Sequence, residues 1–313
     1  MKILVTGGAG FIGSHVAEAL VARGDQVLII DNLEMGKQEW IPVGAEFVKS
    51  DLNDRLVWPM ISEFEPEAIL HAAAAYKKGT TPKQAIETNG IVSTILGLYA
   101  EKKGAKLVYC QTALVYGNPA TTPTPVSAPF SPQCLYAKTK LAGELGITAS
   151  GCRSVIFRKA SVYGPRNLTG PIPIFYDQIK NGKLSHIAQW SSRQFVFIDD
   201  VVPYYVEALH NNAEGIFNLA FGPPVLILDL WEEMRRLLGD PMGSNYIQEN
   251  TPEGSVLTIN LERSHVMDFW GMEHGKNPLG ETSLVYGLEK TIFWYDQHPP
   301  EKTETHFKRH ANV

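Results

Sequence analysis

The sequence predicts an α/β fold in which a doubly wound parallel sheet carries a smaller C-terminal lobe. Over the first 160 residues, short apolar runs alternate with amphipathic stretches, a pattern typical of strands joined by helical crossovers. A glycine-rich turn, Gly7 to Gly13, separates the first apolar run from the first amphipathic stretch. After Gly164 the alternation ends and prolines become frequent, which indicates a lobe of different architecture.

The apolar runs are continuous and rich in β-branched residues, as expected for strands that are covered on both faces. Amphipathic stretches between them have the length of ordinary helices. The expected strands are 3–5, 27–30, 46–48, 68–70, 107–110, 155–157 and 216–219, and the expected helices are 14–23, 54–63, 84–103, 133–150 and 282–295.

These elements divide the chain into two expected domains and a tail. The large domain should comprise residues 1–165, with segments of about 193–221 returning to it. The second lobe should comprise 166–192 and 222–297, and Pro165, Pro171 and Pro173 should interrupt regular structure at its start. The charged tail, 298–313, should be loosely ordered.

Bulk composition argues against several classes of protein. The formal net charge is −5 with dispersed lysines and arginines, so a nucleic-acid partner is not expected. No apolar run reaches the roughly 18 residues of a membrane span, and the N-terminus lacks the pattern of a signal peptide. Cys110, Cys134 and Cys152 fit neither a metal site nor a disulfide framework, which favours a cytoplasmic location. Each cysteine is expected to be a small buried residue, although Cys134 lies close enough to Tyr136 to reach a ligand.

The glycine-rich turn predicts a dinucleotide site. Gly7 permits the tight turn after the first strand, Gly10 lets the backbone approach a pyrophosphate, and Gly13 allows close packing of helix and strand. Phe11 and Ile12 lie between them at the helix N-terminus, where amide groups and the helix dipole bind an anion. This context predicts a Rossmann-type domain.

Acidic residues after the second and third strands indicate which dinucleotide binds. Asp31 stands eighteen residues after Gly13, where a carboxylate accepts hydrogen bonds from ribose hydroxyls and repels a 2′-phosphate, so NAD is favoured over NADP. Asn32 follows it. Asp51 and Leu52 follow the third strand, and Asp51 is expected either to bind the adenine amino group or to cap a turn.

A second motif, Tyr136-Ala137-Lys138-Thr139-Lys140, predicts proton transfer. Tyr136 and Lys140 lie one helical turn apart on one face. A free tyrosine has a pKa of about 10, and a neighbouring ammonium together with the cationic nicotinamide of NAD should lower it. Thr112, just after the fifth strand, is the candidate for orienting a substrate hydroxyl at the carboxyl edge of the sheet.

Together these residues resemble the extended short-chain dehydrogenase/reductase family, and within it the nucleotide-sugar epimerases and dehydratases. The resemblance covers most of the chain. It also rests on His71-Ala72-Ala73-Ala74, Asn89, 162–166, 193–201 and 217–219.

The resemblance implies bound NAD and a catalytic triad of Thr112, Tyr136 and Lys140. Ala72, Ala73, Ala74 and Asn89 are then cofactor-binding residues. It further implies a nucleotide-diphosphate sugar beneath the substrate-binding lobe and a homodimer formed through the helices at about 84–103 and 133–150.

Two positions distinguish activities within this family. Dehydratases of the family have an Asp-Glu pair after the catalytic threonine, whereas this chain has Ala113-Leu114. Neither side chain can transfer a proton, so the sequence resembles the 4-epimerases. With Tyr76 and Lys77, the stretch from Gln111 to Pro125 is most similar to epimerases of bacterial surface-polysaccharide loci.

The substrate contacts follow the family less closely. Ser161 stands where relatives often carry an asparagine. Residues near 250 lack the second arginine that usually binds the pyrophosphate. Arg193 remains as a phosphate-binding fork or as a surface ion pair. Lys77 is either an additional anion contact or a solvated lysine.

The sequence therefore predicts NAD-dependent epimerisation at C4 of a nucleotide-diphosphate hexose through a transient 4-keto sugar. A nucleotide-sugar reductase or dehydrogenase and a dehydratase are the alternatives within enzymes. A non-catalytic NAD-binding module is the alternative from another class.

Overall fold

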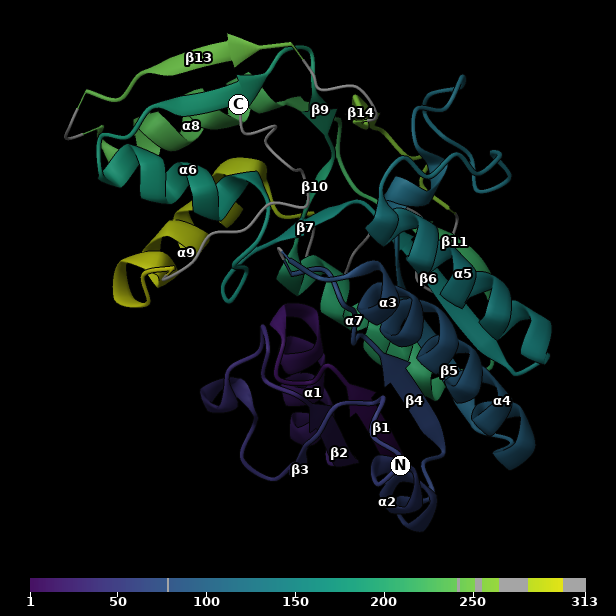
Figure 1. The fold of residues 1–313 in the computed structure, drawn as a ribbon. Coiled ribbons are helices and arrows are strands. Elements are labelled where there is room, and N and C mark those ends of the chain that lie inside the picture. The colour runs from purple at the N-terminus through teal and green to yellow at the C-terminus, as the bar shows by residue number, and fades with distance from the viewer. Residues whose placement is uncertain (78, 241–242, 251–254, 265–280, 301–313) are drawn as a thin grey trace.

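A computed structural model describes residues 1–77, 79–240, 243–250, 255–264 and 281–300. A large parallel sheet forms the lower part of the molecule in Figure 1, and a smaller lobe with α6, α8 and α9 lies above it. The strands are β1 (Lys2–Thr6), β2 (Gln26–Asp31), β3 (Glu46–Lys49), β4 (Ala68–His71), β5 (Lys106–Thr112), β6 (Ser154–Lys159), β7 (Ser161–Tyr163), β8 (Ser185–Ala188), β9 (Ser192–Arg193), β10 (Phe195–Phe197), β11 (Gly215–Leu219), β12 (Val225–Leu226), β13 (Tyr246–Glu249) and β14 (Thr258–Ile259).

Helices connect these strands. The α-helices are α1 (Phe11–Arg23), α2 (Val57–Phe64), α3 (Pro82–Ala85), α4 (Ser93–Lys103), α5 (Leu135–Ser150), α6 (Pro171–Lys180), α7 (Ile198–His210), α8 (Ile227–Leu238) and α9 (Leu284–Gln297), and the irregular helical segments are η1 (Gln38–Trp40), η2 (Ile86–Val92) and η3 (Ala113–Tyr116).

The large sheet has seven parallel strands in the order β11-β6-β5-β4-β1-β2-β3. The order reverses beside β1, so the carboxyl ends of β1 and β4 flank the switch point at which such sheets bind ligands. The α/β fold class with a Rossmann-type sheet is confirmed, and every expected strand is present.

Helices cover both faces of this sheet. Leu20 of α1 and Tyr205 of α7 pack on one face, whereas Ile61 of α2, Leu96 of α4 and Ile147 of α5 pack on the other. The strand residues between them are almost completely buried, which explains why the runs read as apolar throughout. The late strand β11 pairs with β6 at the edge, so the chain returns to the large sheet after β10.

The smaller lobe has its own apolar core, in which Phe175, Trp231 and Tyr295 bring together α6, α8 and α9. Its short strands form two small sheets, β12-β9-β14 and β13-β8. Both sheets join segments distant in sequence, such as β13 and β8, whose residues Glu249 and Ala188 are in register.

Two local expectations were wrong. Pro171 and Pro173 do not interrupt regular structure, because they lie in the first turn of α6, where no backbone N–H donor is needed. The expected helix 84–103 is divided into α3, the π-helical η2 and α4. The expected loose tail falls mostly on residues 301–313, which lie outside the described residues.

Candidate active site

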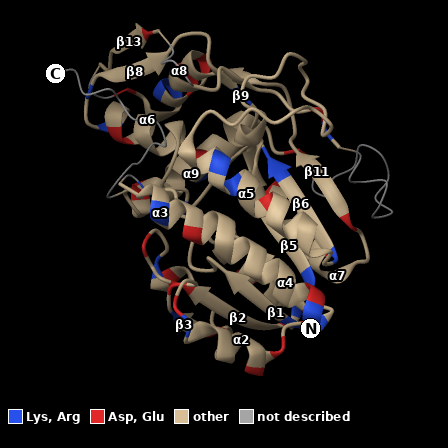
Figure 2. Cartoon of the chain, turned by 45° about the vertical axis from the view of Figure 1, so that its right-hand side comes forward, with Lys and Arg blue, Asp and Glu red and all other residues tan. Residues whose placement is uncertain are grey.

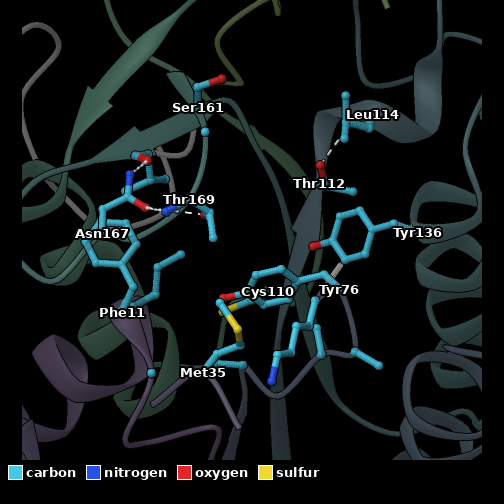
Figure 3. A pocket seen from close by; sticks show the side chains of 18 of the residues that line it. Phe11, Met35, Tyr76, Cys110, Thr112, Leu114, Tyr136, Ser161, Asn167 and Thr169 are labelled. Carbon is cyan, nitrogen blue, oxygen red and sulfur yellow. Dashed lines mark hydrogen bonds between the residues drawn. The ribbon is translucent and has the colours of Figure 1, made fainter. Parts of the chain in front are cut away.

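A cavity of about 900 Å³ lies between the carboxyl edge of the large sheet and the smaller lobe. This volume is within the range of pockets that enclose a ligand. Figure 3 shows Thr112, Leu114 and Tyr136 on one side of it, and Phe11, Asn167 and Thr169 on the other. Of the expected site residues, those that line it are Gly7, Gly10, Phe11, Ile12, Gly13, Asp31, Asn32, Asp51, Leu52, Ala72, Ala73, Ala74, Tyr76, Lys77, Thr112, Tyr136, Ser161 and Arg193.

The glycine turn leaves no room for side chains. Gly7 has a φ of +71°, and a Cβ atom there would lie 2.6 Å from the backbone nitrogen of Ala73. A Cβ atom at Gly13 would lie 2.2 Å from the carbonyl oxygen of Gly7. Backbone amides at the start of α1 are therefore open to the cavity, an arrangement that suits the pyrophosphate of a dinucleotide.

Asp31 ends β2 and holds the glycine turn in place. Its carboxylate accepts hydrogen bonds from the backbone N–H of Ala9, at 3.0 Å, and of Leu33, at 2.8 Å. Burial raises the pKa of this carboxyl group. The carboxylate also lines the cavity, where it can accept hydrogen bonds from ribose hydroxyls.

Asp51 caps a turn, and its contact with adenine stays a prediction. Its Oδ1 accepts a hydrogen bond from the backbone N–H of Asn53 at 2.9 Å, which forms a turn. Its Oδ2 accepts one from Nδ2 of Asn32 at 3.1 Å. Because both residues also line the cavity, this polar pair can meet the adenosine end of a dinucleotide.

Thr112 and Tyr136 lie together at the carboxyl end of β5. The hydroxyl of Thr112 accepts a hydrogen bond from the backbone N–H of Leu114 at 3.2 Å, which fixes its orientation. Tyr136 is in the first turn of α5, and its ring contacts that of Tyr76 edge-on at a centroid distance of 6.1 Å. Figure 3 shows the Thr112 and Tyr136 side chains adjacent at the cavity wall.

Lys140 lies behind this wall and is only 1% exposed. Its Nζ is 3.8 Å from the centroid of the Tyr109 ring. Burial, and to a smaller extent the nearby Lys159, lower the pKa of Lys140 to about 7. Burial also raises the pKa of Tyr136, so the surrounding protein favours a neutral phenol. The expected lowering of the tyrosine pKa, which includes the charge of bound nicotinamide, stays a prediction, since desolvation by the protein alone acts in the opposite direction.

Gln111 connects β5 to α5. Its Nε2 donates to the carbonyl oxygen of Lys140 at 3.0 Å and to the carboxylate of Glu144 at 2.8 Å. Its Oε1 accepts from the backbone N–H of Thr112 at 2.9 Å. Arg158 forms a buried ion pair with Glu144. This network fixes the backbone of Thr112 relative to that of Lys140.

Asn89 is also outside the cavity lining and fully buried. Its side chain accepts from the N–H of Ala75 at 2.8 Å, donates to the carbonyl of Ala75 at 2.9 Å and donates to Thr139 at 3.0 Å. It thereby joins the loop after β4 to α5. Asn89 thus holds Ala75, which directly follows the three alanines expected to contact NAD.

Arg193 lines the smaller-lobe side of the cavity, but most of its guanidinium N–H groups already donate hydrogen bonds to backbone carbonyls. It donates to the carbonyls of Ser192, Val256 and Leu257 at 2.6–2.9 Å. Burial lowers its pKa to about 10. Lys77 is the other candidate anion contact. Its Nζ lies 3.9 Å from Oε1 of Glu34, and both residues line the cavity.

Several cavity residues were not predicted. His186 and Glu249 come from β8 and β13, whose pairing no local pattern indicates. Lys159 carried a signal, since it is a charged residue at the end of an apolar run. Cys110 lines the cavity, whereas Cys134 packs against the core and does not.

Among the described residues, no cluster of three or more His, Cys, Asp or Glu side chains could bind a metal ion. Within the same part of the chain, every helix is too short or too polar to cross a bilayer.

A family model described as the NAD dependent epimerase/dehydratase family matches residues 3–220. The UDP-glucose 4-epimerase of Mycolicibacterium smegmatis is 34% identical over 318 residues, covering 94% of this chain and 98% of its own. The Corynebacterium glutamicum UDP-glucose 4-epimerase is 28% identical and covers 88% of this chain and 92% of its own.

Solved structures agree with these relatives. The Bordetella bronchiseptica enzyme WbmG, in complex with NAD and UDP, has a TM-score of 0.85 and 29% identity, with 98% of each chain covered. The Thermotoga maritima UDP-glucose 4-epimerase with UDP-glucose has a TM-score of 0.84 and 28% identity, covering 95% of this chain and 99% of its own.

Proposed function

The chain belongs to the NAD-dependent epimerase/dehydratase family, and from this membership we propose that it epimerises a nucleotide-diphosphate hexose at C4. The observation that best supports this proposal is that Thr112 and Tyr136 lie next to each other at the cavity wall, beside a glycine turn suited to a dinucleotide. The next residue that lines the cavity after Thr112 is Leu114, which is apolar. Elimination of water would need an acid and a base there, so epimerisation is favoured over dehydration.

The glycine turn, Asp31 and the Asn32–Asp51 pair are suited to hold the pyrophosphate and adenosine of NAD. Bound NAD would supply a reversible hydride acceptor for C4 of the sugar, so the reaction would involve no net redox change. The residues that hold the cofactor differ from those that handle the proton.

Proton transfer falls to Tyr136. Its phenolic oxygen faces the cavity, where it can take the proton of the C4 hydroxyl and return it after the keto sugar has turned. Thr112 holds that hydroxyl, and the hydrogen bond from Leu114 keeps the threonine oriented. Because burial raises the pKa of Tyr136, a neighbouring positive charge from bound nicotinamide is needed to favour the phenolate.

Uridine diphosphate is the proposed nucleotide. The relatives are named UDP-glucose 4-epimerases, and solved neighbours hold UDP or UDP-glucose. On the smaller-lobe side, Arg193 retains donors for a diphosphate, and His186 and Glu249 add polar groups beside it.

The test is turnover of UDP-glucose and UDP-galactose by wild type and by Tyr136→Phe. Loss of the phenol should lower kcat by about 10²–10⁴-fold, the usual contribution of a positioned acid–base group. Wild type should form product while the absorbance of NADH at 340 nm stays constant. A steady change in that absorbance would instead indicate a reductase or dehydrogenase.

A matched control is Tyr99→Phe, because Tyr99 lies on α4, away from the cavity, with its hydroxyl on the carbonyl of Ile61. This variant should retain wild-type kcat. Wild-type turnover by Tyr136→Phe would contradict the assignment of the base. Bound NAD without turnover of any nucleotide-sugar would favour a non-catalytic module.

We further propose that two copies associate through η2, α4 and α5. Ile91, Ile95 and Leu98 follow one another at helical spacing and are 51%, 40% and 53% exposed. Leu145 on the neighbouring α5 is 53% exposed. No charged residue occurs between residues 88 and 100, and the middle of this helical stretch carries no charge colour in Figure 2. Such a contiguous apolar face is typical of an interface.

A further inference from the structure

Lys159 lies beside the proposed reaction centre. It is the last residue of β6, and its register partner on β5 is Thr112. Residues paired in a parallel sheet have their side chains on the same face, with backbones about 4.8 Å apart. Lys159 lines the same cavity as Thr112 and Tyr136. A long cationic side chain therefore starts one strand away from the hydroxyl that is proposed to hold the C4 hydroxyl of the sugar.

The ammonium of Lys159 lacks a counterion among the described residues. Burial lowers the pKa of Lys159, and the groups that interact with it electrostatically are the thiol of Cys110 and the repelling ammonium of Lys140. The described acidic residues that line the cavity lie elsewhere. Asp31 ends β2, four strands away, or about 19 Å at the usual strand spacing. Glu249 forms a pair with His186 in the smaller lobe at 2.5 Å.

A neutral hexose would leave this cation without a partner in a desolvated site, which is unfavourable. In a hexuronate, the carboxylate is carried by C5, the neighbour of C4. The adjacency of the hydroxyl and carboxylate in such a sugar matches the adjacency of Thr112 and Lys159. Ser161, two residues further along, also lines the cavity and supplies a hydroxyl donor.

We propose that Lys159 binds a carboxylate on the sugar and that the preferred substrate is a nucleotide-diphosphate uronic acid. The proposal rests on the proposed function for the location of the sugar. It assigns the class of the substrate, which Thr112, Tyr136 and Lys140 alone do not determine.

The test measures binding to NAD-loaded protein carrying Tyr136→Phe, so that no ligand is converted. Dissociation constants of UDP-glucuronate and UDP-glucose are determined by calorimetry, with and without Lys159→Met. Hydrogen bonds to charged groups are typically worth a factor of about 10–100 in binding. UDP-glucuronate should bind at least tenfold more tightly than UDP-glucose. Lys159→Met should lower the ratio of the two dissociation constants at least tenfold. Lys159→Arg should restore part of it.

Lys103→Met, at the exposed end of α4, is the matched control and should leave the ratio unchanged. Equal affinities in the parent protein would overturn the inference. A preference that survives Lys159→Met would also overturn it, and concurrent loss of NAD would assign Lys159 to the cofactor.

Epimerisation by the otherwise wild-type enzyme separates the two proposals. If UDP-glucose is converted as efficiently as UDP-glucuronate, the proposed function stands and the Lys159 inference fails. If UDP-glucuronate is bound preferentially through Lys159 but no nucleotide-sugar is converted, Lys159 is a carboxylate-binding residue, whereas the proposed reaction and the assignment of the substrate both fail.

Discussion

At the scale of single residues, Lys140 and Tyr136 share a desolvated environment that acts on them in opposite directions. Burial disfavours the charged form of each, so it lowers the pKa of the amine and raises that of the phenol. Near pH 7 the phenol of Tyr136 is therefore neutral and Lys140 is only partly protonated, in contrast to the ion pair that the Tyr-x-x-x-Lys spacing suggests. The charge of bound nicotinamide would then act on a site with reduced positive charge from Lys140.

Lys140 should make stability depend on pH. Its pKa is about 7 in the folded protein without ligands, against about 10.5 when exposed. Between these values the unfolded chain binds a proton that the folded chain does not, so this residue's contribution to stability increases as pH rises. From pH 7 to pH 9 the free energy of unfolding of wild type should rise by about 2 kcal/mol relative to Lys140→Met.

Urea unfolding of the NAD-free proteins at the two pH values measures this difference. Lys103→Met, whose side chain is exposed, should follow wild type at both values. A constant difference between wild type and Lys140→Met would contradict this prediction, because it would show that Lys140 stays charged in the folded protein throughout this range.

Residue-level prediction from sequence succeeded where function follows from local spacing. Gly7, Asp31 and Tyr136 line the cavity because each stands at a fixed offset from a strand end or a helix start. Lys140 and Asn89 were also predicted as site residues, but neither side chain lines the cavity, and their roles stay predictions. Lys159 was missed although the rule that selected Thr112 also applies to it, because the register that pairs the ends of β5 and β6 is not visible in the sequence.

At the scale of elements, α5 carries both the proposed catalytic tyrosine and part of the proposed dimer interface. Its first turn presents Tyr136, its buried face carries Lys140 and Glu144, and its outer face exposes Leu145. Gly143 and Gly146 let it pack closely against η2 and α4, since a Cβ atom at Gly146 would lie 1.9 Å from the hydroxyl of Thr94. A change at the outer face can therefore be tested without altering the catalytic side chains.

Leu98→Glu should disrupt the proposed dimer. A carboxylate within a closed apolar interface loses its hydration without gaining a partner. Sedimentation velocity at micromolar concentration should give a dimer for wild type and a monomer for the variant. Leu56→Glu, at a site that is 76% exposed near α2, should remain dimeric. A monomeric wild type would contradict the proposal.

Element boundaries were predictable to the extent that local rules decide them. The central strands and α5 were found from apolar periodicity and glycine positions. Pro171 and Pro173 were misinterpreted because proline interrupts the interior of a helix but is favourable in its first turn. The presence of proline alone does not show which of these two positions it takes. The π-helical η2 arises in packing against α5, which an isolated helical pattern does not reveal.

At the scale of the whole molecule, both the large domain and the smaller lobe line the cavity, and the chain passes between them more than once. The glycine turn and Asp31 belong to the large sheet, whereas His186, Arg193 and Glu249 belong to the small sheets of the other lobe. The large domain follows from consecutive crossovers and could be anticipated. The small sheets pair β8 with β13 and β9 with both β12 and β14, and such distant pairings leave no periodic signal.

This division predicts where each ligand protects the backbone from hydrogen exchange. NAD should slow exchange around the glycine turn and the end of β2, because its pyrophosphate and ribose are expected to contact those amides. UDP added to the NAD-bound protein should slow exchange in β8, β9 and β13, where His186, Arg193 and Glu249 line the cavity. The measurement is hydrogen–deuterium exchange followed by mass spectrometry.

AMP at the same concentration is the control for UDP, because it carries a nucleotide phosphate without the expected base or diphosphate. Peptides from α2, which lies away from the cavity, should exchange at unchanged rates in every condition. Each ligand can protect only the amides whose opening it opposes, so the pattern reports which lobe binds the nucleotide. Protection by UDP confined to the glycine turn and β2 would place the nucleotide on the large sheet and remove the smaller lobe from substrate recognition.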